Sequence, residues 1–377
     1  MGRNQASLKQ SMRLADHIVH PITTLCLRVR GTKDIRTVFR MMLSMLLFFV
    51  CSLEIGSSRQ SLTWRLNSSH ALLQSPRVYV CGYNFTVLAS VLFPERIIKD
   101  WNADHSSVPN DILIASGYHC NVSSGYSGKI LYVDGENGVL PVQFENRTNV
   151  FYLGAAAPEN HRGASLQLFH IAHTTLFHPY SESDFLRTRL SPIGSHFLVY
   201  INSHCVDFRE HAFDAITNLA RQHQFELPEA RGTCKGYDGQ NIWNPVGKYN
   251  ARLSSVVEVM RQYRFALVME NSNKPGYVTE KIANAFIAGA IPVYYGTRDV
   301  FKIFNPDAFI YYDIEQPIHA LQEIVSLEMD LNAYSAKRAK PILRDGTRTL
   351  AKYFSLRHGH SRNSLRSRIR RMLGADK

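Results

Sequence analysis

The segment ENSNKPGYVTEKIANAFIAGAIPVYYG (270–296) gathers charged and amide side chains directly after an apolar run. That run, FALVM (265–269), has the continuous hydrophobic character of a central parallel strand covered on both faces. Thr279 is a good helix N-cap, Glu280 suits a first turn, and Gly289 can end the helix. The pattern predicts a strand, a polar loop, a helix and a second strand. The loop would lie at the carboxyl end of a sheet, where ligands bind in open α/β folds.

The predicted helix start could bind a phosphate, because its first N–H groups lack intrahelical acceptors and carry partial positive charge. Lys281 adds a full charge on the first turn, and Glu280 beside it offers acceptors for a ribose diol. This pair suggests a grip on a nucleoside diphosphate, with Asn271 and Tyr277 as further amide and phenol contacts. A capped surface helix with a solvated Glu–Lys pair stays open as the alternative.

The elements that must position these residues are short strand-like runs that alternate with helical patterns. The strand-like runs are RVYVCGY, DILIASG, KILYVDGE, NVFYLGAA, HFLVYINS, FALVME, AIPVYYG and AFIYYD. The helical patterns are FREHAFDAITNLARQH, ARLSSVVEVMRQY, EKIANAFIAG and PIHALQEIVSLEM. This alternation predicts an α/β fold of parallel sheets with crossover helices. A boundary near SPIGS (191–195) divides it into two α/β domains, 76–192 and 193–355.

The net charge of +12 is concentrated at the two ends of the chain. Residues 1–40 carry eight Lys and Arg against two acidic side chains, and residues 336–377 carry thirteen against two. The residues between them are mildly acidic, so a basic groove for nucleic acid is not expected in the main fold. The Arg-rich end, 356–377, is interpreted as a solvated or docking tail rather than a site.

The apolar segment MMLSMLLFFVCSL (41–53) is shorter than the roughly 20 residues that span a bilayer, and reaches about 19 if flanking arginines snorkel. We expect an uncleaved membrane anchor at 41–54, because the residues before it are too many for a usual signal-peptide n-region. A signal peptide and a buried helix stay open. The basic residues 1–40 orient that side to the cytoplasm, and the Ser-rich residues 55–75 would form a stem.

Two further features agree with a lumenal body. All four N-x-S/T sequons follow the apolar segment, at Asn67, Asn84, Asn121 and Asn146. Four cysteines also follow it, and an even number in an oxidising compartment predicts two disulfides. We expect Cys81–Cys120 and Cys205–Cys234, the pairing that keeps each bridge within one proposed domain. Four buried thiols are the alternative.

Residues 265–296 closely resemble the signature of the family 10 glycosyltransferases, the α-1,3/1,4-fucosyltransferases. The matching residues are Glu270-Asn271-Ser272, Tyr277-Val278-Thr279-Glu280-Lys281, Gly289 and Pro292-Val293. Met269 replaces the usual aromatic residue. FNPDAFIYYD (304–313) resembles the family's next block, and weaker similarity extends over residues 130–315.

The resemblance implies two Rossmann-like domains facing a cleft, the GT-B arrangement, with GDP-fucose on the C-terminal domain. Carried over to this chain, the residues that contact the nucleotide are Asn271, Tyr277, Glu280 and Lys281. The stretch YINSHCVDFREHAFDAI resembles the family segment that places Arg209 as a second cation on the pyrophosphate. A planar guanidinium suits that role because it can pair two phosphate oxygens. An ordinary first-turn helix residue is the alternative for Arg209.

LYVDGENG (131–138) resembles the family segment that supplies the general base, which assigns this role to Glu136. Inverting transfer needs one carboxylate to take the acceptor hydroxyl's proton as its oxygen attacks C1 opposite the departing GDP. Asp134-Gly135-Glu136 also fits a D-x-E metal site and a plain turn, and both readings stay open. No cofactor is expected to be required, although Mn²⁺ or Mg²⁺ can stimulate, because two cations neutralise the diphosphate.

The sequence thus predicts an inverting fucosyltransferase that forms an α-1,3 linkage in the Golgi, as a single-pass type II membrane protein with a lumenal catalytic region. The expected partners are GDP-fucose, a glycan on glycoprotein or glycolipid, and the membrane, and not nucleic acid. The same fold using GDP-mannose and an inactive glycan-binding membrane protein are the alternatives. The stretch FYLGAAAPENHRGASLQLFHIAHTTLF matches no acceptor motif of the family that we recognise, so the acceptor is left open.

Overall fold

The computed structural model describes most of the chain beyond residue 75. The described residues are 76–81, 85–101, 109–116, 120–122, 126–134, 140–155, 157–169, 172, 181–189, 192–202, 204–232, 234, 256–357 and 361–375. The expected tail, anchor and stem (1–75) and the sequons at Asn67 and Asn84 lie outside these ranges. None of the helices within them combines the length and the hydrophobicity needed to cross a lipid bilayer.

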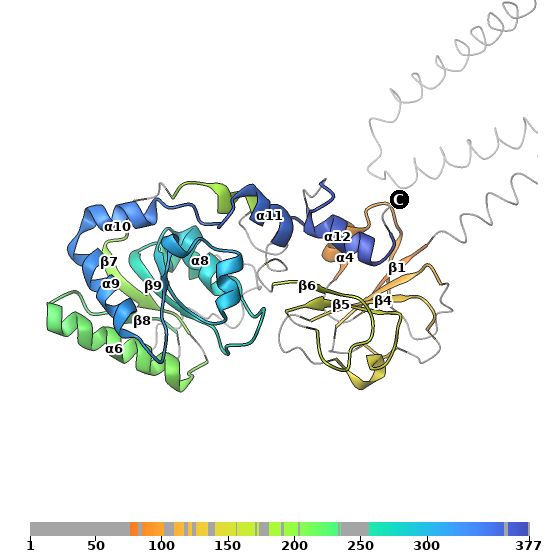
Figure 1. The fold of residues 1–377 in the computed structure, drawn as a ribbon, viewed down its shortest axis with the longest axis horizontal. Helices are drawn as coiled ribbons and strands as arrows, with labels where there is room; N and C mark the ends of the chain where they lie inside the picture. The colour runs from red at the N-terminus through yellow and green to blue at the C-terminus, as the bar shows by residue number, and fades with distance from the viewer. Residues whose placement is uncertain are drawn as a thin grey trace, which may run out of the picture. The chain divides into compact units, whose positions relative to one another are not determined.

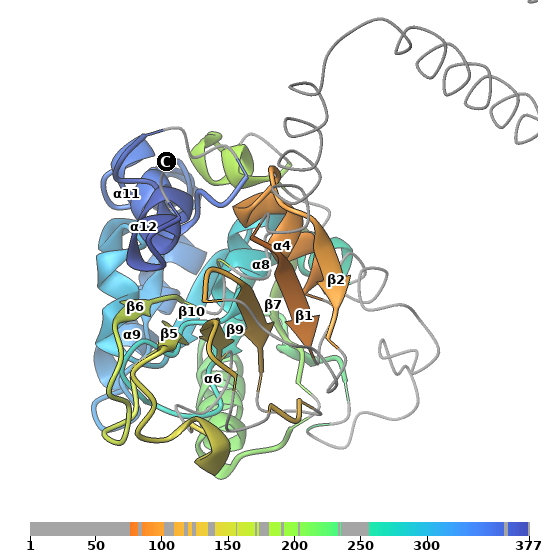
Figure 2. The ribbon, with the colours of Figure 1, turned by 90° about the vertical axis from the view of Figure 1, so that its right-hand side faces the viewer.

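The first sheet has six strands that all pair in parallel, in the order β2-β1-β3-β4-β5-β6. The strands are β1 (Val78–Cys81), β2 (Ile98–Asp100), β3 (Ile112–Ala115), β4 (Lys129–Val133), β5 (Val150–Gly154) and β6 (Ser165–Gln167). Helix α4 (Thr86–Leu92) connects β1 to β2, which pairs with β1 at one edge of the sheet (Figure 2). Strands β1 and β3 are buried along their whole length, as continuous apolar runs in a covered parallel sheet must be.

The second sheet has five parallel strands in the order β11-β10-β9-β7-β8. The strands are β7 (His196–Tyr200), β8 (Glu229–Ala230), β9 (Tyr263–Met269), β10 (Ile291–Tyr295) and β11 (Ile310–Tyr311). The main helices are α6 (Asp207–His223), α8 (Glu280–Ala288) and α9 (Ile318–Met329). Short 3-10 turns lie at η1 (Val142–Phe144), η2 (Glu182–Leu186), η4 (Arg298–Lys302) and η5 (Pro306–Ala308).

Helices cover both faces of the second sheet (Figure 1). Side chains alternate along a strand, so β9 supplies two cores at once. Ala266 and Val268 pack with α8 on one face, whereas Phe265 and Leu267 pack with α6 and α9 on the other. The predicted α/β class with parallel sheets is therefore confirmed. The eight predicted strand-like runs coincide with β1, β3, β4, β5, β7, β9, β10 and β11, although β9 begins two residues before its run.

The order of the second sheet creates a topological switch point between β7 and β9. The chain leaves β7 through α6 to β8 on one side, and later continues from β9 through α8 to β10 on the other side. The connections that follow β7 and β9 therefore diverge at the carboxyl edge of the sheet. Open α/β sheets bind their ligands in the crevice that such a divergence leaves.

The C-terminal helices are α10 (Leu331–Arg338), α11 (Thr347–Tyr353) and α12 (Leu365–Met372). The last of them returns to the first sheet, where Leu365 and Ile369 share a buried cluster with Leu88 of α4. Arg370 donates a hydrogen bond to the Leu92 carbonyl at 2.6 Å and pairs with Glu95. Most of the Arg-rich segment 356–377 is thus docked through an apolar stripe, with its charges at the rim.

Both expected disulfides are confirmed, and the alternative of four buried thiols is wrong. Cys81 at the end of β1 is bonded to Cys120, and Cys205 just before α6 is bonded to Cys234. The second bridge joins the segment that follows β7 to the segment that follows β8. The two described sequon asparagines, Asn121 and Asn146, are exposed.

Candidate functional site

The start of α8 is built as the sequence predicts. Thr279 is the N-cap, in an extended conformation, and its hydroxyl accepts a hydrogen bond from the Lys281 N–H at 3.5 Å. Gly289 ends the helix in the left-handed region at φ 88°. The loop between β9 and α8 turns at Gly276, whose φ is +77° and whose N–H donates to Asp299 at 2.6 Å. A capped helix therefore directs its amino end toward the carboxyl edge of the sheet.

Glu270 lies at the centre of this turn, and its side chain is completely buried. One carboxylate oxygen accepts from the Thr279 N–H and the other from the Thr279 hydroxyl, each at 2.7 Å. The Tyr294 hydroxyl approaches the first oxygen at 3.5 Å. A buried carboxylate is stable only with such donors, and these donors come from the helix cap and from β10. Glu270 thereby joins three consecutive elements.

Lys281 reaches back over the same turn. Its Nζ lies 3.4 Å from Glu270 Oε2 and 3.1 Å from Thr279 Oγ1, and its side chain is 23% exposed. Burial acts to lower the pKa of Lys281, but the carboxylates of Glu270 and Glu280 outweigh it and the pKa is raised. An ammonium has three donors. Two acceptors contact it among the described residues, which leaves one donor for a ligand.

Arg209 lies in the first turn of α6 and is only 1% exposed. Its guanidinium donates to the Asn271 side-chain oxygen at 2.6 Å, to the Met269 carbonyl and to the His204 carbonyl at 3.0 Å. It therefore joins the segments that diverge after β7 and β9. Burial lowers the pKa of Arg209, and the neighbouring Tyr200 and Glu270 oppose this. Arg209 does lie in the first helical turn, as both the proposed role and its alternative require, and it is buried rather than solvated.

The structure brings together Arg209, Asn271 and Lys281, and it places Tyr277 and Glu280 on the same loop and helix start. Tyr277 is 4% exposed and Glu280 is half-buried. The guanidinium of Arg209 donates hydrogen bonds to protein oxygens and does not face solvent, which the sequence did not indicate. Lys281 forms its ion pair with the buried Glu270, which the alternative of a solvated pair with Glu280 did not include.

The proposed base, Glu136, lies outside the described residues. Asp134, two positions earlier, directly follows β4 at the carboxyl edge of the first sheet, and Tyr152 donates a hydrogen bond to it at 2.7 Å. Burial and this contact raise the pKa of Tyr152. Among the described residues, Asp134 joins no group of three possible metal ligands.

Two groups of potential metal ligands occur in the described part of the chain, and both have structural explanations. In one, Cys205 and Cys234 are bonded to each other and Glu210 accepts from the Tyr200 hydroxyl at 2.6 Å. The other contains His196, Glu226 and Glu229.

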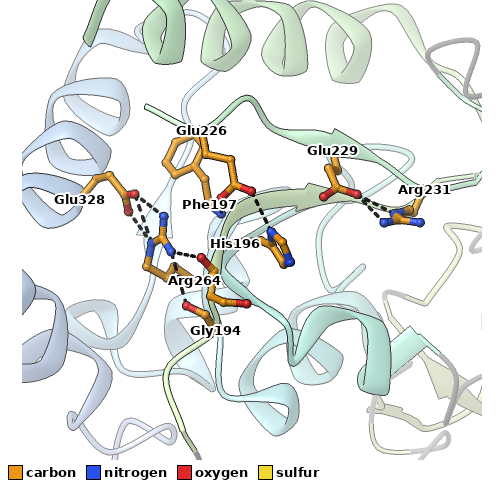
Figure 3. A network of polar contacts seen from close by, with 9 residues as sticks. Gly194, His196, Phe197, Glu226, Glu229, Arg231, Arg264 and Glu328 are labelled. Atoms are coloured by element: carbon orange, nitrogen blue, oxygen red, sulfur yellow. Dashed lines mark hydrogen bonds and ion pairs between the residues drawn. The ribbon is translucent and has the colours of Figure 1, made fainter. Parts of the chain in front are cut away.

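That second group lies at the amino end of β7, the edge opposite the switch point (Figure 3). Glu226 is bonded to His196 Nδ1 at 2.7 Å and to the Phe197 N–H at 2.8 Å. Glu229 is paired with Arg231. The carboxylates are committed to these partners, so the network ties the loops at this edge to the strand and is not interpreted as a metal site.

Glu270 and Thr279 are the residues of the site whose roles sequence reasoning missed. Thr279 was assigned only as a cap, and Glu270 was assigned no role. The signal was present, because a glutamate directly continued the most apolar strand of the chain. A carboxylate that directly extends a buried strand is expected to be buried as well, so it needs several hydrogen-bond donors. The loop that follows the strand is the segment expected to supply them.

A doubly wound parallel sheet with a cationic, capped helix start at its switch point defines a nucleotide-binding type of α/β protein. Comparison with known proteins gives a more specific class for part of the chain. Residues 197–336 match the family model described as Glycosyltransferase family 10 (fucosyltransferase) C-term. Residues 197–336 are thus similar to the C-terminal domain of this family, which confirms the resemblance predicted from the sequence.

Curated relatives match over short segments. An alpha-(1,3)-fucosyltransferase of Helicobacter pylori is 38% identical over 97 residues, which are 26% of this chain and 20% of the relative. Alpha-(1,3)-fucosyltransferase 7 of Homo sapiens is 42% identical over 73 residues, 18% of this chain and 21% of the relative. The chain thus matches about a fifth of the length of these relatives.

A solved structure, an alpha1,3-fucosyltransferase with GDP-fucose, has a TM-score of 0.53 and 19% sequence identity. The match covers 81% of this chain and 93% of the other. At this level of identity the match shows that the fold is shared, beyond the segment that the family model covers.

Proposed function

We propose that this chain is an inverting fucosyltransferase that transfers fucose from GDP-fucose to a glycan hydroxyl, with α-1,3 linkage. The observation that carries the proposal is the ammonium of Lys281, held at the capped amino end of α8 on the switch point. The family model over residues 197–336 supports the reaction class, and the relatives' names support the donor and the linkage.

The donor site follows from the charges. The diphosphate would meet the first N–H groups of α8 and the free donor of Lys281, while Glu280 and Tyr277 lie on the same turn for the ribose and base. Arg209 would act through its charge and by fixing Asn271, because its Nη1 and Nη2 groups donate to protein oxygens. Its buried Nε–H has no hydrogen-bond partner among the described residues. Cations at the leaving group stabilise the charge that develops there, which is usually the largest catalytic effect.

The transfer step needs one base. The acceptor oxygen forms a bond to C1 of fucose, the bond from C1 to the β-phosphate oxygen breaks, and the hydroxyl proton goes to Glu136. Support for this assignment comes from Asp134, which directly follows β4 at the carboxyl edge, two residues before Glu136. We propose that no metal is required, because two cations and a helix amino end already neutralise the diphosphate, and that Mn²⁺ or Mg²⁺ can stimulate.

We also propose that the protein is a Golgi enzyme of type II topology, anchored through residues 41–54 with its catalytic region in the lumen. The two disulfides support an oxidising compartment. The exposed sequon residues Asn121 and Asn146 are accessible for glycosylation.

The proposal is tested with the full-length chain in detergent. GDP binding is measured by calorimetry, and transfer from GDP-fucose and from GDP-mannose is measured on a glycan array, with and without EDTA. We expect GDP binding, transfer of fucose only, and activity that persists in EDTA. Because a carboxamide cannot accept the proton, Glu136→Gln should abolish transfer and retain GDP binding.

Each failure has a distinct meaning. Transfer of mannose instead of fucose would replace the donor and keep the fold and mechanism. GDP binding without any transfer would favour an inactive glycan-binding protein. Absence of GDP binding by the unmodified chain would overturn the proposed function altogether.

A further inference from the structure

A fully buried carboxylate directly behind a diphosphate site is unexpected, because it repels the ligand. Glu270 has no exposed surface, yet it lies 3.4 Å from the ammonium that the diphosphate needs. The residues packed against Glu270 leave its side chain little room to take another conformation. A Cβ added at Gly296 would lie 2.7 Å from Glu270 Cγ and 2.4 Å from the Tyr294 hydroxyl. So confined a carboxylate indicates that Glu270 has a role beyond filling space in the core.

The four contacts of Glu270 all lead to the start of α8 or to the strand beside it. Two go to the backbone and hydroxyl of Thr279, one to Lys281 and one to Tyr294. Thr279 Oγ1 donates to the carboxylate and lies 3.1 Å from Lys281 Nζ, so the cap residue and the cation are oriented by the same group. Glu270 thus orients both the cap residue Thr279 and the ammonium of Lys281, the two features that make the start of α8 attractive to an anion.

We propose that Glu270 is a positioning residue for the donor site, which anchors the cap of α8 and holds Lys281 charged and aimed while one of its donors faces the ligand. The inference rests on the proposed function, since it assigns a role toward the same diphosphate. Glu270 touches neither the sugar nor the reacting atoms and acts through Lys281 and Thr279. Its negative charge is neutralised locally by Lys281, so the net repulsion felt by the ligand is small.

The protonation of Lys281 should depend on Glu270 in a direction that can be measured. Burial and the nearby Arg209 both favour the neutral amine of Lys281, and the carboxylates of Glu270 and Glu280 favour the ammonium. Tyr277 and Tyr294 also lie near this group of charges. In the wild-type chain the pKa of Lys281 is raised, so the ammonium persists well above neutral pH. Without the Glu270 carboxylate, the pKa of Lys281 should fall, because burial and Arg209 would then be opposed by the Glu280 carboxylate.

The test uses Glu270→Gln in the full-length chain, with GDP titrated by calorimetry between pH 7.0 and pH 9.5. The glutamine oxygen can still accept from the Thr279 N–H, whereas its amide group cannot neutralise Lys281. We expect the wild-type affinity to stay nearly constant over this range. The variant should lose about tenfold to a hundredfold as pH rises, the contribution of one hydrogen bond to a charged group.

Tyr294→Phe is the matched control, since it removes another buried partner of Glu270 and leaves the ion pair intact. Its affinity should stay flat with pH. A flat profile for Glu270→Gln as well, even at reduced affinity, would overturn the proposal, because a merely structural role does not depend on the charge of Lys281. Absence of GDP binding by the wild-type chain would instead reject the proposed function.

If Glu270→Gln does not fold, NMR of the lysine ε-carbons in the wild-type chain supplies the same test. The Lys281 signal is assigned as the one lost in Lys281→Met. A titration midpoint above that of the other lysines supports the proposal, and a midpoint at or below theirs contradicts it.

Discussion

Replacing Lys281 with methionine should weaken both the fold and the donor site, because it removes one half of a buried ion pair. The Nζ atom lies 3.4 Å from Glu270 Oε2, and the two side chains are 23% and 0% exposed. At that separation Coulomb's law gives about 5 kcal/mol with an effective dielectric constant of about 20. Partial exposure of Lys281 reduces this, so we expect Lys281→Met to lower the free energy of unfolding by about 3 kcal/mol.

Methionine keeps the aliphatic stem and its packing, so this loss reports the charge. In a chain of this size about 3 kcal/mol corresponds to a decrease in Tm of roughly 4–5 °C. The affinity for GDP at neutral pH should fall about tenfold to a hundredfold, since a hydrogen bond from a charged donor is lost. Differential scanning calorimetry and GDP titration measure the two effects separately.

A double-mutant cycle refines the test. Most of the expected loss comes from leaving Glu270 buried without its cation, so Lys281→Met combined with Glu270→Gln should be more stable than Lys281→Met alone. If the losses of the two single variants simply add to within about 0.5 kcal/mol, the side chains are not coupled and the reasoning is refuted.

Two further predictions concern backbone geometry and the opposite edge of the sheet. Gly276→Ala should impair GDP binding and lower stability by more than about 1–2 kcal/mol, because φ is +77° and the new Cβ would lie 2.3 Å from the Ala155 carbonyl oxygen. Gly346→Ala is the control, since φ is +50° and nothing lies within 4 Å, so it should lower only the Tm, and equal effects would contradict the argument. Arg264→Met should lower the free energy of unfolding by about 3–5 kcal/mol in urea titrations, because Glu328, with its side chain 9% exposed, loses a hydrogen bond of 2.8 Å (Figure 3). GDP affinity should be retained, and a change below about 1 kcal/mol would show that the pair contributes little.

Much of the fold followed from local patterns. Continuous apolar runs such as 265–269 marked the buried parallel strands, and the spacing from Thr279 to Gly289 marked a helix with both of its ends. The strands that were not predicted, β2, β6 and β8, have two or three residues each, too few for any periodicity to show. The helix α12 was hidden by its own charge, because its three apolar residues, Leu365, Ile369 and Met372, stand among arginines and look like a solvated tail until a partner surface is known.

The residues proposed to bind the sugar nucleotide were predicted in less detail than the fold. Lys281 and Glu280 follow from a helix start that sequence alone reveals, whereas the partner of Lys281 does not. Glu270 is eleven positions away, and only the return of the loop between β9 and α8 brings its carboxylate to the ammonium. The predicted contact of Arg209 with a diphosphate stays a prediction, and its burial behind Asn271 could not be seen in a list of residue types.

The sequence by itself determined most of the longer strands and helices, where the anion-attracting helix begins and which family its motif resembles, because capping, turn and burial preferences act over a few neighbouring residues. Only the tertiary structure decided that Arg209 meets Asn271, 62 positions further along the chain, and that both lie where the connections diverge. That meeting depends on β7 and β9 becoming neighbours in the sheet. The strand order is fixed by the packing of helices on both faces of the sheet, and no local pattern encodes it.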